Sequence, residues 1–401
     1  MAEVVLQIIS ILFINTLLTF NTIVGTPERM TAIFILFAVS GVFCVLLLIK
    51  DRKTIKDTIV NPYTVWMVYF GILLFVYGIQ LQDKNRYAAT FHAANLVYVI
   101  LIMCILWHLK DKMLDSLCVV ASIQAVIRFV YSLNYEWDEF VRVREYDGWI
   151  RLGNTPIENV NSAAIWYSLF LVPLMFNLFF RKKLWCIPGA IACCIGGFFS
   201  GSKKSVLMIA ILFLICITVG AKNWKRALIN VTVLLVIFII MLPRFHYNYT
   251  LWVFIGSRFE DVIAYLKGEA TNGSSSLARA SYFKLAFENA WDKPLFGHGW
   301  DAFRTDLSVK IGGDATYAHN NFAEILYDMG IWGIISYYAA PLMLFVDAIR
   351  SRKKDTIVYI FMTLLTTIIA EVGSVSVYYT ITIILFWGCA YIFERLEHEK
   401  S

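Results

Sequence analysis

The run Tyr317-Ala318-His319-Asn320 stands where a polar segment meets a long apolar one. A histidine at a membrane mouth can accept and release a proton near neutral pH. The Asn320 amide would orient the imidazole or hold an acceptor hydroxyl. Gly330 and Gly333 lie three residues apart and predict a smooth strip on the following helix, against which another helix packs. The run therefore predicts an acid–base site; the alternative is a histidine that only forms hydrogen bonds at the interface.

A second candidate, Arg279, lies in the segment 276–291, whose residue preferences predict a short helix that ends before Pro294. One face of this helix is expected to carry Tyr282, Leu285, Ala286 and Asn289. If the helix lies on the membrane surface, the guanidinium can meet a diphosphate, which its planar pair of donors suits. The alternative is a solvated arginine on a loop helix.

A third candidate is the pair Lys203 and Lys204 in Gly201-Ser202-Lys203-Lys204-Ser205. Small residues before a helix let a phosphate approach the backbone amides, and the helix dipole favours the negative charge. We therefore predict an anion site there. The alternative is that both lysines extend to lipid headgroups or to water.

No metal site or other cofactor is predicted. The eight cysteines all fall in apolar runs, and none forms a Cys-x-x-Cys pair. The sequence has no Asp-x-Asp pair, and no acid and histidine cluster with metal spacing is expected on the outer side. The cysteines are expected to pack as small apolar residues between helices.

The composition indicates a membrane protein. Of 401 residues, 59% are hydrophobic and 16% charged, whereas a soluble domain has about 25% charged residues. A chain of this size cannot hide so much apolar surface in a water-soluble core. The net charge of +6 does not indicate nucleic-acid binding, because most basic residues flank apolar runs and so report membrane topology.

Apolar stretches bounded by charged or turn residues predict an all-α integral membrane protein with about twelve transmembrane helices. The stretches are 4–24, 31–49, 59–80, 91–107, 114–132, 162–180, 184–199, 206–220, 227–243, 321–346, 356–371 and 375–393. Alternate connections and the C-terminal tail carry eighteen lysine and arginine residues, against five in the opposite short connections. The richer side is the cytoplasm, so both termini are expected there.

We predict a single polytopic membrane domain over 1–401 with two long extracytoplasmic segments, 133–161 and 244–320. The cytoplasmic connections are too short to build a site, so function is expected on the outer face. The second segment separates predicted spans nine and ten. We expect it to fold back over the membrane as short helices and to close a cavity.

A known family signature resembles the spacing of four residues in this region. His319 and Asn320 are followed after nine residues by Gly330, and after two more by Gly333. That signature is His-[Asn/Ser/Gln]-x9-Gly-x-x-[Gly/Thr/Tyr], from the bacterial O-antigen polymerase and O-antigen ligase superfamily, which includes the Wzy-type polysaccharide polymerases. The family's outer-loop block before the histidine is similar to Arg279 with Trp291, Pro294, Gly297 and Gly299.

Two further segments extend the resemblance to roughly 150–335. Phe199 to Ser205 is similar to the family's Ser-Gly-Ser-Arg element, with Lys203 and Lys204 where arginine is usual. Lysine keeps the charge but loses the bidentate geometry. The segment from Arg151 to Asn161 loosely resembles an Arg-x-x-Gly…Asn-Pro-Asn segment, with its asparagines offset, so only Arg151 is carried over.

The resemblance implies a GT-C-like fold with a large helical loop between spans nine and ten. It implies a site on the periplasmic or outer side of the bacterial inner (cytoplasmic) membrane. The substrates would be undecaprenyl-diphosphate-linked oligosaccharides, without metal or nucleotide sugar. The implied partners are the lipid bilayer, a chain-length regulator and a flippase, and no nucleic acid.

The resemblance and the charges of the candidate residues together imply a role for each of them. Arg279, Lys203 and Lys204, with Arg151, would hold the diphosphate and neutralise the charge that grows as it leaves. His319 would bind or deprotonate the acceptor hydroxyl, with Asn320 and Tyr317 as substrate-binding residues. Direct displacement at the anomeric carbon would invert its configuration.

Three functions stay open. A polymerase would build O-antigen or capsular polysaccharide, whereas a ligase would transfer the finished glycan to lipid A core of lipopolysaccharide or to another acceptor; the motif residues do not separate them. A lipid-linked glycan transporter is the third. Against it, the central connection 181–183 is short, the largest loop is off-centre, and charge within the predicted spans is scarce, with Arg128 and Glu371 the main candidates.

Overall fold

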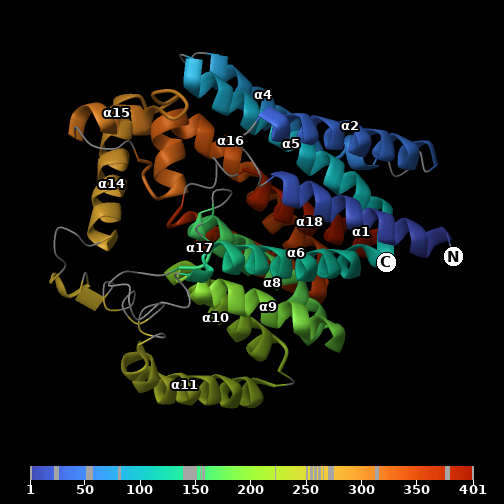
Figure 1. Cartoon of the computed structure of the whole chain (residues 1–401), viewed down its shortest axis with the longest axis vertical. Helices are drawn as coiled ribbons and strands as arrows, with labels where there is room; N and C mark the ends of the chain where they lie inside the picture. The colour runs from blue at the N-terminus through green and yellow to red at the C-terminus, as the bar shows by residue number, and fades with distance from the viewer. Residues whose placement is uncertain are drawn as a thin grey trace. The chain divides into compact units, whose positions relative to one another are not determined.

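The computed structural model in Figure 1 describes residues 2–21, 27–50, 57–79, 83–138, 151–153, 155, 159–221, 223–249, 252, 256, 260, 263–264, 266–269, 275–311, 316–374 and 380–399. Within these residues all regular secondary structure is helical, as the composition predicts.

Each of the twelve predicted apolar stretches overlaps a long helix. These helices are α1 (Ala2–Asn21), α2 (Pro27–Lys50), α4 (Pro62–Ile79), α5 (Asp83–His108), α6 (Met113–Tyr135), α8 (Val160–Phe179), α9 (Ile187–Phe199), α10 (Lys203–Val219), α11 (Trp224–Tyr247), α16 (Asn321–Ser351), α17 (Lys354–Glu371) and α18 (Thr380–Glu399). A short 3-10 helix, η2 (Leu184–Cys186), precedes α9. The sequence therefore predicted the positions of the long helices.

Three of the described helical segments are long and apolar enough to cross a membrane: Lys110–Tyr135, Val160–Phe179 and Asn321–Ser351. Several shorter helices are also apolar. Large apolar side chains point away from the protein on some of them, such as Val42, which is 61% exposed, and Ile72, which is 59% exposed. A helix that is apolar on its outer face as well suits lipid rather than water as its surroundings.

The contacts group the chain into two compact units. Unit 1 contains residues 1–33 and 114–270, and unit 2 contains residues 34–113 and 271–401. The single domain over 1–401 stays a prediction, and each unit is described by itself.

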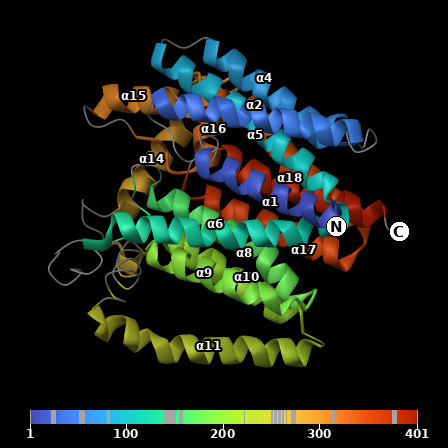
Figure 2. The same ribbon diagram turned by 45° about the vertical axis from the view of Figure 1, so that its right-hand side comes forward.

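In unit 1, α8 packs against α9 and α10, which lie beside it in Figures 1 and 2. Glycines allow the close approach: a Cβ atom at Gly196 would lie 2.4 Å from the Tyr167 ring, and one at Gly197 would lie 2.6 Å from Ser205 Oγ. Small residues are the usual means of close helix packing in a bilayer, where burying apolar side chains gains little.

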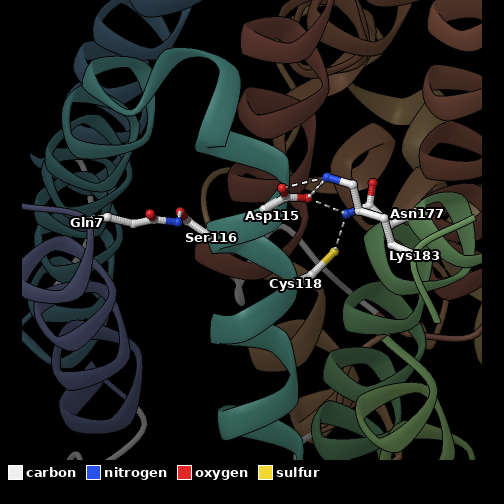
Figure 3. Close-up of polar contacts among 6 residues, drawn as sticks. All are labelled: Gln7, Asp115, Ser116, Cys118, Asn177 and Lys183. Carbon is white, nitrogen blue, oxygen red and sulfur yellow. Dashed lines mark hydrogen bonds and ion pairs between the residues drawn. The ribbon is translucent and has the colours of Figure 1, made fainter. Parts of the chain in front are cut away.

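Polar contacts join α6 to its neighbours in unit 1 (Figure 3). Lys183 Nζ lies 2.5 and 2.6 Å from the two Asp115 carboxylate oxygens, and Asn177 Nδ2 donates to Asp115 Oδ1 at 3.0 Å. On the other side of α6, Gln7 Nε2 of α1 donates to Ser116 Oγ at 3.0 Å. The ion pair fixes the short connection between α8 and α9 against the start of α6.

In unit 2, α4 is tied to α16 and α18. Tyr63 Oη donates to the Ile384 carbonyl at 2.6 Å, and Trp66 Nε1 donates to the Ser336 carbonyl at 2.7 Å. Both rings belong to a packed aromatic group that includes Trp387. Burial of such rings with their polar atoms bonded gives a rigid core.

The two charged side chains noted inside predicted spans have identifiable contacts. The Arg128 guanidinium lies over the Trp166 ring, 4.6 Å from its centroid. In unit 2, Glu371 Oε1 accepts a hydrogen bond from Tyr337 Oη at 2.8 Å. Both contacts fit a structural role, since buried charge in a membrane needs a partner.

The described part of segment 244–320 contains the short helices α14 (Ser275–Asn289) and α15 (Ala302–Ile311), and the 3-10 helix η4 (Ala290–Asp292). The expected short helices are therefore present. Much of 250–274 and of 133–161 lies outside the described residues. The position of α14 on the membrane surface stays a prediction.

Candidate active site

His319 precedes α16 in an unusual backbone conformation. Its φ is +55°, in the left-handed region, which only its surroundings can hold at a non-glycine residue. Asn320 begins the helix: its Oδ1 accepts from Ala323 N at 3.0 Å, and its Nδ2 donates to the Val372 carbonyl at 3.3 Å. Asn320 is thus the N-cap of α16, a role that the sequence did not assign.

Glu324 holds the other side of the same turn. Its side chain is fully buried, and its Oε2 accepts a hydrogen bond from Ala318 N at 2.5 Å. The residues on either side of His319 are therefore fixed, one by an amide and one by a carboxylate. This arrangement sets the backbone from which the imidazole projects.

Two tyrosines flank the His319 ring. The Tyr317 ring lies 4.3 Å from it between centroids, tilted by 51°. The Tyr282 ring of α14 lies 5.9 Å away and is nearly parallel, at 22°. The structure therefore brings Tyr317 and α14 close to His319.

Arg279 lies on α14 one turn before Tyr282, so both side chains project from neighbouring positions on one side of the helix. Arg279 is half-buried. It makes no hydrogen bond or ion pair within the part of the chain that the structure describes, whereas Lys284 on the same helix lies 3.8 Å from Glu288. The Arg279 donors are thus available to a ligand.

A small apolar cluster holds α14 against α16. Its buried members are Ala286, Ala290, Phe303, Ala318, Ala323, Leu326 and Tyr327. Tyr282 and Leu285 pack against it, which confirms the expected face of α14 for these two and Ala286. The alanines of this cluster let the backbones of α14 and α16 approach closely. The packing of α14 on α16 therefore fixes the position of Arg279 relative to His319.

Gly330 does not form the smooth strip that its spacing suggested; that expectation is wrong. The glycine interrupts α16 with φ +67° and ψ −163°. A Cβ atom there would lie 2.6 Å from the Leu295 carbonyl, so the contact is with a loop and not with a second helix. At Gly333 a Cβ atom would meet Met329 of the same helix at 2.2 Å.

The loop that fills this break is hydrogen-bonded along both of its edges. His298 N donates to the Tyr327 carbonyl and Gly299 N to the Asp328 carbonyl, both at 2.9 Å. Beyond the break, Ile331 N donates to the Pro294 carbonyl at 2.8 Å. Gly330 of the signature is thus needed because the loop backbone packs against α16 at this break and leaves no room for a side chain.

Asp328 supports the same region. Its side chain is buried, and its two oxygens accept hydrogen bonds from Asp301 N at 2.8 Å and from Phe303 N at 3.1 Å. These amides belong to the start of α15, so the carboxylate caps that helix and complements its dipole. Asp328 and Glu324 were not among the predicted site residues, although an acidic residue within an apolar stretch is a signal for a functional or structural role.

In unit 1, Arg151 is held by two hydrogen bonds. Its Nε donates to the Ser200 carbonyl at 2.9 Å, and its Nη2 donates to Asn161 Oδ1 at 3.1 Å. Next to it, Gly153 N donates to Glu136 Oε2 at 2.9 Å. This segment therefore links the ends of α6, α8 and α9.

Lys203 and Lys204 are the first two residues of α10 and are half-buried. Gly201, with φ +58°, makes the turn before them. The lysines thus open a helix, as expected, but anion binding there stays a prediction. They belong to unit 1 with Arg151, whereas Arg279, Tyr317, His319 and Asn320 belong to unit 2.

Residues 188–338 match the family model described as O-antigen ligase. This part of the chain is similar to the O-antigen ligase family. The match confirms the resemblance over these residues, which include every candidate except Arg151. Members of this family are integral membrane enzymes that transfer glycans from lipid-linked substrates, of ligase or polymerase type. No curated protein matches the chain.

The geometry of the turn before α16 and of the break in this helix explains the residues of the signature. The histidine stands in a strained turn, the following amide caps the helix, and the first glycine admits the loop. The eight cysteines of the chain are free thiols; seven are buried and Cys194 is half-buried. The described residues contain no group of three or more His, Cys, Asp or Glu placed to hold a metal ion.

Proposed function

We propose that this multi-pass membrane protein polymerises undecaprenyl-diphosphate-linked repeat units into O-antigen or capsular polysaccharide. The observation that carries the proposal is that the His319 ring lies close to the Tyr317 and Tyr282 rings, and that Arg279 comes one turn before Tyr282 on α14. A base, aromatic surfaces for sugar rings and an unpaired planar cation are the groups that such a transfer needs.

The proposed topology has twelve spans in the bacterial inner membrane. The long helices support it, since each overlaps a predicted span, and the excess of basic residues in alternate connections gives the orientation. In this topology α16 begins outside and ends in the cytoplasm. His319 then faces the periplasm or the outside, where lipid-linked glycans are assembled.

Arg279 is proposed to bind the donor diphosphate. Two parallel N–H donors match two phosphate oxygens, and the charge stabilises the diphosphate as it leaves. In unit 1, Lys203 and Lys204 at the start of α10 are proposed to bind a phosphate group, and Arg151 is proposed to hold the turn that precedes them. In this metal-independent scheme the cations do the neutralising work that a metal ion does in other glycosyltransferases.

His319 is proposed to act on the acceptor. As the acceptor oxygen forms a bond to the anomeric carbon, the bond from that carbon to the diphosphate oxygen breaks and the configuration inverts. The acceptor proton passes to the imidazole, and undecaprenyl diphosphate departs. Asn320 is proposed to serve mainly by capping the helix that carries this histidine, and Tyr317 by supporting the ring and the bound sugar.

The test supplies purified lipid-linked repeat units alone to the protein in detergent. A ladder of multiples is the expected product. No elongation without a second acceptor, followed by transfer once lipid A core is added, would instead identify a ligase, which the family description names. A chain-length regulator and a flippase are proposed as partners; the ladder itself should not need either.

A further inference from the structure

A cavity of about 380 Å³ lies in unit 2 between the C-terminal part of α4 and the loop before α15. Its lining includes Leu73, Val76, Tyr77, Lys293, His298 and Trp332. None of these residues has a role in the reaction described above. In the proposed topology the end of α4 is its outer end, so the cavity opens at the outer surface of the membrane.

The walls of the cavity are fixed before any ligand arrives. Tyr77 Oη donates to the Phe296 carbonyl at 2.9 Å and to the Met329 carbonyl at 3.3 Å, which ties α4 to the loop. Gly297 packs so closely that a Cβ atom would lie 2.4 Å from the Asp328 carbonyl. A preformed pocket loses little conformational entropy on binding.

The polar residues of the cavity lining, Lys293 and His298, suit a phosphate. Lys293 is exposed and makes no ion pair within the described part of the chain. The His298 ring stacks on Tyr327 with centroids 4.2 Å apart, and its Nδ1 lies 3.2 Å from the Tyr327 carbonyl oxygen. Nδ1 must carry hydrogen to make that bond, so Nε2 is the ring nitrogen left for a ligand.

The α4 side of the cavity suits an isoprenoid chain. Exposed apolar residues continue along one side of α4 from Val76 in the cavity wall: Ile72, Val68 and Val65. Trp332, 46% exposed, stands at the cavity wall, and such rings favour the boundary between headgroups and hydrocarbon. A cationic head site beside an apolar helix face matches a lipid with a phosphate head.

Resting on the proposed polymerase reaction, we propose that this cavity holds the diphosphate of the acceptor substrate. Polymerisation joins two lipid-linked glycans, and each carries a diphosphate whose charge must be balanced. Arg279 serves the donor, so the acceptor needs a second cationic site. His298 rests on Tyr327, eight residues beyond His319 and so roughly 12 Å along α16. An oligosaccharide held at the cavity can bridge that distance to the base.

The first experiment counts bound lipids by native mass spectrometry with undecaprenyl diphosphate as the probe. Wild-type protein should bind two molecules, and Lys293→Glu and Trp332→Ala should each bind one. Lys284→Glu is the matched control, because Lys284 is also exposed in unit 2 and does not line the cavity; it should bind two. Two molecules bound by both cavity variants would overturn the assignment.

The second experiment measures elongation of an acceptor analogue in which carbon replaces the anomeric oxygen, so that it accepts but cannot donate. Lys293→Glu should raise the KM for this analogue at least tenfold while kcat is retained, and Lys284→Glu should change neither. An unchanged KM beside a normal ladder would overturn the acceptor site and leave the polymerase function standing. Equal competition by phosphatidylglycerol would also overturn it, by showing a general lipid site. Failure of the wild type to form any ladder would overturn both proposals.

Discussion

Arg151 in unit 1 and Arg279 in unit 2 were assigned to the same ligand by resemblance, yet the structure holds them differently. Both are half-buried. Arg151 uses two of its donors on the Ser200 carbonyl and the Asn161 side chain. Arg279 makes no such bond within the described residues. A guanidinium with its donors engaged positions other segments, whereas one without partners is ready to meet an anion.

The surroundings differ in the same way. Around Arg151 the contacts join backbone segments, such as Leu152 N to the Phe199 carbonyl at 2.9 Å. Arg279 comes one turn before Tyr282 on α14, and the Tyr282 ring lies 5.9 Å from the His319 ring. We infer that unit 2 carries the chemistry and that the Arg151 segment maintains the turn that precedes Lys203.

The largest expected effect is at His319. His319→Ala should lower the elongation rate by about 10³-fold, within the usual range for loss of a general base. Undecaprenyl diphosphate binding should be retained, since the cations provide most of the binding. Elongation is measured as the ladder formed per minute, and His398→Gln at the C-terminal end of α18 is the control for loss of a histidine.

His319→Gln separates two roles of this residue. Glutamine keeps hydrogen bonding but cannot take a proton, so a general base predicts a loss similar to that in alanine. Near-normal turnover in the glutamine variant would leave only acceptor positioning. Near-normal turnover in His319→Ala would remove His319 from the site.

The second effect is at Arg279. Arg279→Lys should reduce elongation about tenfold, because the charge remains but the paired donors are lost, and Arg279→Ala should reduce it about 100-fold. The thermal unfolding midpoint should not change, since no described bond is broken. Lys284→Ala on the same helix is the control. Wild-type rates in both Arg279 variants would make Arg279 a surface charge.

The third effect tests whether the break in α16 at Gly330 stabilises unit 2. Gly330→Ala should destabilise the protein by about 3 kcal/mol, from a positive φ and a close backbone contact together. Gly41→Ala in α2 is the matched control, because a Cβ atom there meets nothing within 4 Å; it should be neutral or stabilising. Equal unfolding midpoints for both variants would show that the α16 break is not needed.

The same glycine shows how far the sequence could reach. The spacing of the signature was visible, and so were the helices, because apolar run length determines them. The break was not, because it depends on Leu295 and Gly297, which come from a loop outside the helix. Glu324 and Asp328 were missed for a related reason: their partners, Ala318, Asp301 and Phe303, are backbone amides that no residue pattern marks.

The fourth prediction concerns Arg151. Arg151→Lys should lose the two described hydrogen bonds and lower stability by about 2 kcal/mol. Elongation should fall only as the folded fraction falls, so lowering the assay temperature should restore it. A tenfold loss of rate at an unchanged unfolding midpoint would instead place Arg151 at the diphosphate, as for Arg279.

The smallest expected effect is at Asn320, where the sequence and the structure suggest different roles. Asn320→Ala removes the N-cap of α16 and should lower stability by about 1 kcal/mol. Asn320→Asp keeps a capping oxygen but loses the donor to the Val372 carbonyl, so it should retain most of that stability. If Asn320 only caps the helix, elongation should follow stability in both variants. If its amide holds the acceptor hydroxyl, the aspartate variant should be well folded and still raise the acceptor KM, and the cap would then be the secondary role.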